Sequence, residues 1–84
     1  MDPKTIRKII NEMFEQYHSP EIEEPVIKKF LKKYGIEDEE EVWKFLVKAE
    51  DLGLITICAS TRKYGEISIV KGDLRNWGKV IFKI

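Results

Sequence analysis

Few side chains in this sequence could act as a nucleophile or as a general base. The chain has one histidine, His18, and one cysteine, Cys58, and it lacks a phosphate loop of the G-x-x-x-x-G-K type. His18 ends an apolar helical pattern, where satisfying the helix dipole is commoner than base catalysis. Cys58 stands among β-branched residues, as a small core residue does. We therefore expect no catalytic residue, no metal ligand, no cofactor and no enzymatic activity.

The densest run of charge is acidic and covers residues 37–41. Such a run could attract a divalent cation, but side chains of consecutive helical residues point in different directions and do not converge on one ion. Asp38 and Glu41 instead have the spacing of a capping box, and Glu39 and Glu40 suit the positive end of a helix. The run predicts a solvated, capped helix start.

Basic residues gather in the second half of the chain. The net charge is zero, yet residues 21–41 hold four lysines against eight acids, whereas residues 52–84 hold six cations against two acids. Cations interleaved with aromatic rings suit phosphate contact with stacking. The candidate nucleic-acid residues here are Arg62, Lys63, Tyr64, Lys71, Arg75 and Asn76. The alternative is that charges at a hairpin tip serve solubility, while Trp77 covers a sheet edge.

Apolar spacing predicts three helices. The first begins at Asp2 and Pro3, the second begins at Pro25 and ends at Gly35, and the third begins at Asp38 and ends at Gly53. Their apolar stripes are Ile6, Ile9, Ile10, Met13, Phe14 and Tyr17; then Val26, Ile27, Phe30, Leu31 and Tyr34; then Val42, Phe45, Leu46, Ala49 and Leu52.

The period then changes to that of strands. Residues 54–60 and 66–70 are rich in β-branched residues and flank a turn with Gly65, which predicts a hairpin. Alternation over residues 79–84 predicts a third strand, and Ile22 either forms a brief strand or anchors a loop. We expect one α+β domain over residues 1–84, a three-helix bundle followed by a β-hairpin and a third C-terminal strand.

This order of elements resembles the winged-helix (winged helix-turn-helix) superfamily, in particular its small free-standing, archaeal-type domains. The most specific residues are Ala49-Glu50-Asp51-Leu52-Gly53-Leu54-Ile55, which look like the junction where the third helix enters the wing. The resemblance implies that the third helix lies in the DNA major groove and that the hairpin wing touches the backbone or minor groove. It also implies a transcription regulator, often a homodimer.

The third helix departs from that pattern. Residues 38–52 contain no Arg, Asn, Gln, Ser or Thr, the types that read base edges, and their first turn is three glutamates. Only Lys44 and Lys48 could contact phosphate from this helix. We therefore expect double-stranded DNA to be bound mainly by the wing and by second-helix cations, Lys28 and Lys32. Those lysines could equally form a solvated helix face.

A protein-interaction domain is the alternative function, serving dimerisation or assembly. Trp43 and Val47 extend the apolar sector of the acidic third helix towards its flank, and buried aromatic residues dominate interface energies. With Trp77 they are the candidate interface residues, and the acidic start of the third helix belongs to the same expected contact surface. Trp43 could instead pack on the second helix or on the expected strand at residues 79–84.

The composition of the sequence indicates the cellular compartment of the protein. No apolar run approaches 18 residues, the first residues lack the apolar stretch of a signal peptide, and a single cysteine fits a reducing environment. We expect a cytoplasmic protein with no membrane contact. Abundant Lys, Glu and Ile with few Asn and Gln are typical of a thermophilic source.

Overall fold

The helix ends follow local signals in the sequence. A computed structural model describes residues 1–61 and 64–74, and its helices are α1 (Pro3–Tyr17), α2 (Glu24–Lys32) and α3 (Glu39–Asp51). The Asp2 carboxylate accepts a hydrogen bond from the Lys4 N–H at 3.2 Å, with Pro3 in the first turn. This satisfies one of the donors that a helix start leaves without a partner.

Both later helices end in the same way. Gly35 and Gly53 each have a φ of 76°, a left-handed conformation that glycine adopts without steric cost. The N–H of Ile36 then donates to the Leu31 carbonyl at 3.1 Å, and that of Leu54 donates to the Ala49 carbonyl at 3.0 Å. These are the closing bonds of Schellman motifs, so the predicted stops are confirmed.

The start of α3 differs in one detail from the expected capping box. Asp38 stands at the N-cap, and its carbonyl accepts the Val42 N–H at 2.9 Å, but its side chain makes no capping hydrogen bond. The first turn of α3 consists of Glu39, Glu40 and Glu41, whose negative charge suits the positive helix end.

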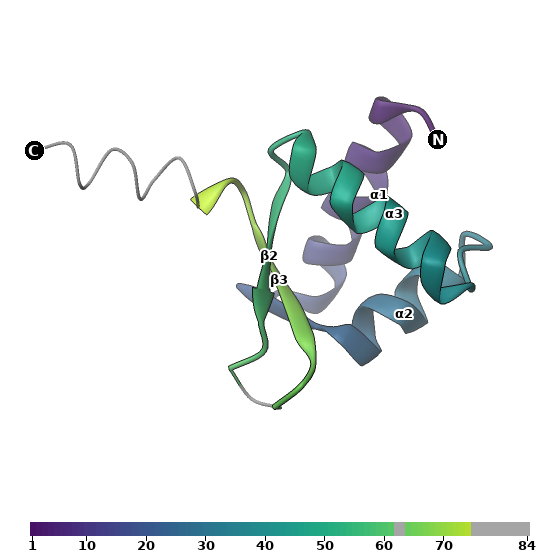
Figure 1. The fold of residues 1–84 in the computed structure, drawn as a ribbon. Coiled ribbons are helices and arrows are strands. Elements are labelled where there is room, and N and C mark those ends of the chain that lie inside the picture. The colour runs from purple at the N-terminus through teal and green to yellow at the C-terminus, as the bar shows by residue number, and fades with distance from the viewer. Residues whose placement is uncertain (62–63, 75–84) are drawn as a thin grey trace, which may run out of the picture.

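The described residues also form an antiparallel sheet of three strands, β1 (Glu21–Glu23), β2 (Ile55–Ala59) and β3 (Ile67–Lys71), in the order β1-β3-β2. The predicted β2–β3 hairpin is confirmed, and Ile22 does form a brief strand. This strand precedes α2 and supplies the third member of the described sheet. The strand expected at residues 79–84 lies outside the described residues. Figure 1 shows the helices gathered on one side of the hairpin.

The core lies between the helices and one face of the sheet. Ile22 and Ile57 both pair with Ile69. Ile22 and Ile69 are at most 2% exposed. The predicted apolar stripes supply most of the other buried residues: Ile6, Ile9, Ile10, Met13, Phe14, Ile27, Phe30, Leu31, Val42, Phe45, Leu46 and Ala49.

Two predicted core residues are instead 40% exposed, Tyr34 and Leu52. Both stand just past the last residue of a helix, where the side chain no longer follows the helical period. Tyr34 donates a hydrogen bond from its hydroxyl to Glu12 of α1, and this bond raises the pKa of the tyrosine.

Candidate interaction surfaces

The most apolar exposed surface of a helix in the described chain lies on α3. Trp43 and Val47 are 43% and 44% exposed, and they are one helical turn apart on the side away from the buried stripe. Around them is a shallow, open surface that we call the outer α3 face, formed by Glu40, Trp43, Lys44, Val47, Lys48, Asp51 and Leu52. Trp43 therefore stands outside the buried core.

Charge is distributed unevenly along the outer α3 face. The helix starts with three glutamates, whereas Lys44 and Lys48 follow one and two turns later. Lys44 lies 3.7 Å from Glu40, an i,i+4 ion pair in which both side chains are about three-quarters exposed. Such exposed pairs contribute little to stability, about 0.3–0.5 kcal/mol. The face thus has a basic middle between Glu40 at one end and Asp51 at the other.

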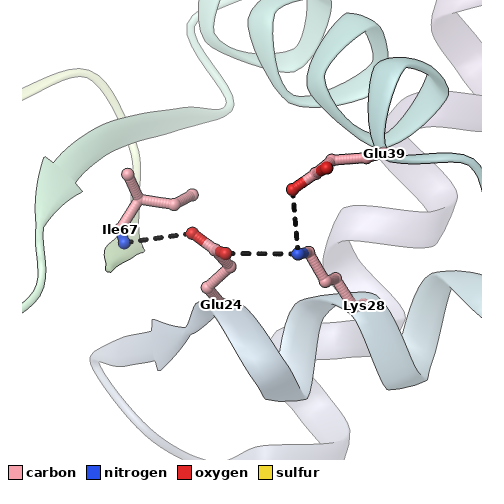
Figure 2. Close-up of polar contacts among 4 residues, drawn as sticks. All are labelled: Glu24, Lys28, Glu39 and Ile67. Atoms are coloured by element: carbon pink, nitrogen blue, oxygen red, sulfur yellow. Dashed lines mark hydrogen bonds and ion pairs between the residues drawn. The ribbon is translucent and has the colours of Figure 1, made fainter. Parts of the chain in front are cut away.

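A hydrogen bond to the backbone of β3 and two ion pairs connect α2, α3 and β3 (Figure 2). One oxygen of the Glu24 carboxylate accepts the Ile67 N–H at 3.2 Å, and the other lies 3.3 Å from the Lys28 ammonium. The same ammonium lies 3.4 Å from the Glu39 carboxylate. The Glu24 hydrogen bond, followed by that of Glu39 and their negative charges, raises the pKa of Lys28.

Lys28 is therefore a poorer phosphate ligand than its sequence position indicates. Its charge faces two carboxylates, so a phosphate would have to compete with both of them. The i,i+4 spacing of Glu24 and Lys28 is visible in the sequence, whereas the approach of Glu39 depends on how α3 packs against α2.

The structure spreads the other predicted DNA-binding residues over several elements. Lys32 is the last residue of α2, Lys44 and Lys48 lie on α3, and Tyr64 and Lys71 stand before and at the end of β3, all of them exposed. Tyr64 and Lys71 are thus at opposite ends of one strand. Arg62, Lys63, Arg75, Asn76 and Trp77 lie outside the described residues.

The single cysteine lies in a strand, and the single histidine lies at the end of a helix. Cys58 lies on β2, half-buried, and its thiol donates to the Thr56 carbonyl at 3.8 Å. Burial, with the nearby charges of Glu21 and Glu50, raises the pKa of this thiol, which keeps it protonated at neutral pH. His18 is exposed at the end of α1 with a left-handed φ of 47°. Within residues 1–61 and 64–74, no three His, Cys, Asp or Glu side chains are grouped to hold a metal ion.

Glu40 belongs to the acidic start that the sequence predicts as part of a contact surface, whereas Asp51 and Leu52, which also line the outer α3 face, are not predicted as site residues. The spacing of Glu40, Val47 and Asp51, which are seven and four residues apart, could have placed them on one helix side. The exposure of Leu52 depends on where α3 ends.

No protein-family model matches the chain, and no curated protein or solved structure matches it either. The described residues define a small α+β domain of three helices and a three-stranded antiparallel sheet, and this layout is compatible with a winged helix. In the described part of the chain, no helix has the length and apolar character needed to cross a membrane.

Proposed function

We propose that this chain is a winged-helix protein-interaction domain that binds another protein surface through its outer α3 face. The observation that carries the proposal is the exposure of Trp43 and Val47 side by side on a helix whose opposite side already fills the core. Large apolar residues grouped on a surface and rimmed by charges are typical of protein contacts. Tryptophan in particular is enriched among residues that dominate binding energy.

The charges of α3 favour a protein partner over the DNA major groove. The helix end that would enter the groove carries Glu39, Glu40 and Glu41, which phosphates repel. Lys44 is already paired with Glu40, and Lys28 with Glu24 and Glu39. The outer α3 face therefore offers apolar contact area and a charged rim, and it lacks the Arg, Asn and Gln side chains that make many of the specific contacts to base edges.

Photochemical cross-linking at position 43 tests this function. A benzoyl-phenylalanine replacing Trp43 in the purified chain is expected to form adducts of discrete mass in a lysate of the cells that naturally produce it. Adding Val47→Asp should abolish them, because a carboxylate in the apolar contact is costly to desolvate. The matched control carries the photo-reactive residue in place of Lys29, which is exposed on α2. No more adduct at position 43 than at position 29 would overturn the proposal.

DNA binding through the wing is a second candidate, favoured by the excess of four positive charges in residues 52–84 and by the exposure of Tyr64 and Lys71. On this view the domain is a transcription regulator. Its affinity for duplex DNA should fall with rising salt on a slope that corresponds to a few phosphates. Reversing the charges of Arg62 and Lys63 should weaken binding at every salt concentration; unchanged affinity would exclude this mode.

A further inference from the structure

We infer that three side chains, those of Ser19, Glu24 and Glu50, block the edges of the sheet and keep the β2–β3 hairpin from pairing its backbone with other extended chains. The inference goes beyond the proposed function and does not rest on it. An edge strand presents N–H and C=O groups that its own sheet does not use, and these groups are a template for a further strand. In this domain a side chain occupies such groups at three places.

The pairing of β2 with β3 determines which backbone groups of β2 face outwards. The Ser60 N–H donates to the Glu66 carbonyl at 2.9 Å, just beyond the ends of the two strands. In an antiparallel pair, hydrogen-bonded positions alternate with positions whose N–H and C=O groups point to the opposite side. The backbone groups that point away from β3, toward the free edge of the sheet, are therefore those of Ile55, Ile57 and Ala59.

Glu50 blocks the middle of this edge. Ile57 is the central residue of β2, and its N–H donates to the Glu50 carboxylate at 2.8 Å. Glu50 lies in the last turn of α3, so the carboxylate reaches the edge from the helix that packs on β2. A strand added to β2 would have to break this charge-assisted hydrogen bond and would enclose the carboxylate in the new contact. Both changes cost free energy.

Ser19 blocks the opposite edge, which belongs to β1. Ile22 of β1 is paired with Ile69 of β3, whose backbone groups face β1, so the N–H and C=O groups of Glu21 point away from the sheet. The Ser19 hydroxyl accepts the Glu21 N–H at 3.3 Å and donates to the Glu21 carbonyl at 2.6 Å. One hydroxyl thus occupies both groups. With only three residues, β1 is also a short edge, which adds to the protection.

Glu24 closes the gap that β1 leaves beside β3. The strand β1 ends at Glu23, where α2 begins, whereas β3 extends past that point to Ile67. The Ile67 N–H faces this gap and donates to the Glu24 carboxylate at 3.2 Å (Figure 2). The same carboxylate holds Lys28, so the blocking side chain is itself fixed in place.

The β2 edge is the one where a block matters most. Its five residues extend over about 17 Å, which is long enough to pair with another strand. Ile55 and Ile57 are β-branched and apolar, as residues of strands that associate edge to edge commonly are. Because Ile57 is central, a strand of similar length cannot add to β2 without using its N–H. We therefore expect Glu50 to be the residue whose loss opens the sheet.

Amide hydrogen exchange of the full chain, measured by NMR, tests the contact itself. In Glu50→Ala the Ile57 N–H loses its acceptor, so its exchange rate relative to that of the buried Ile69 should rise at least about tenfold. Using Ile69 as the reference removes any change in global stability. Glu50→Gln should keep most of the protection, because its amide oxygen can still accept the hydrogen bond. An unchanged ratio in Glu50→Ala would show that Glu50 does not protect the edge.

Self-association of the purified chain tests the consequence. At about 0.5 mM, Glu50→Ala should reach a weight-average mass at least about twice that of the wild type, with an infrared amide I signal of intermolecular β-structure. The wild type and Glu50→Gln should lack this signal at the same concentration. The matched control is Glu15→Ala, which removes the same charge from an exposed position of α1 and should behave as the wild type does.

Three results would overturn the inference. The first is a Glu50→Ala protein that stays free of intermolecular β-structure, and the second is a wild type that already shows it. The third is equal association of Glu15→Ala, which would attribute the effect to net charge and not to the edge. None of these results bears on the outer α3 face, because Glu50 does not belong to it. Cross-linking at position 43 can therefore succeed or fail independently.

Discussion

Replacing Ile69 with alanine is expected to lower the free energy of unfolding by about 3 kcal/mol, within the range of about 2–5 kcal/mol for truncating a buried isoleucine. Ile69 is fully buried at the centre of β3 and pairs with Ile22 on one side and Ile57 on the other. Its side chain therefore lies at the interface between the sheet and the helices. The surrounding residues belong to three strands and cannot all move into the space left by the missing methyl groups.

The loss is a large part of the stability that a domain of this length can have. At about 0.05–0.15 kcal/mol per residue, 84 residues give roughly 4–12 kcal/mol. The melting temperature measured by circular dichroism should fall by about 12–24 °C, since 1 kcal/mol corresponds to about 4–8 °C in a domain of this size. Urea unfolding at 25 °C gives the free energy independently.

Ile67→Ala is the matched control, since it removes the same atoms from the same strand. Ile67 is half-buried at the start of β3 and packs at the margin of the core. Its truncation should cost less than half as much as that of Ile69, because part of its surface is already in water. Equal losses for the two variants would mean that the core is not centred on Ile69.

The sequence predicts the helices and the hairpin well because their signals are local. Pro3 and Pro25 mark helix starts, and Gly35 and Gly53 mark helix stops whose left-handed backbone most other residues avoid. These features act within a few residues of each other, so they are present in the sequence before any tertiary contact forms.

The arrangement of the sheet depends on distant residues and is predicted less well. Ile22 pairs with Ile69, which is 47 positions later in the chain, and no local pattern selects that partner. A three-residue strand is too short to show a reliable alternation, so the sequence left Ile22 as either a strand or a loop anchor. Once β3 forms, β1 satisfies its other edge.

The candidate surfaces show the same difference between what local sequence predicts and what tertiary packing decides. The helical period places Trp43 at the flank of the apolar stripe of α3, where a side chain can complete the core or remain exposed. Only the packing of α3 decides between these, and it leaves Trp43 43% exposed. Lys28 is similar, because its pairing with Glu39 requires α2 and α3 to approach each other. The charge of a residue is visible in the sequence, but its availability to a ligand depends on its neighbours in space.

Trp43→Ala is expected to separate binding from stability. Because Trp43 is outside the core, its removal should change the free energy of unfolding by less than about 1 kcal/mol. Trp43 stands in the protein contact proposed for the outer α3 face, and truncating an interface tryptophan costs about 2 kcal/mol or more. The dissociation constant for the protein that cross-links at position 43 should therefore rise by at least about 30-fold.

Phe45→Ala on the same helix should behave in the opposite way. Phe45 is 5% exposed and points into the core, so its truncation should cost about 3–5 kcal/mol of unfolding free energy. The fraction that remains folded should bind that partner almost as the wild type does, because Phe45 is not among the residues of the outer α3 face. If Trp43→Ala instead unfolds the domain while leaving the affinity of the folded protein for that partner unchanged, Trp43 has a structural role, and the exposed side of α3 is not where this chain meets a partner.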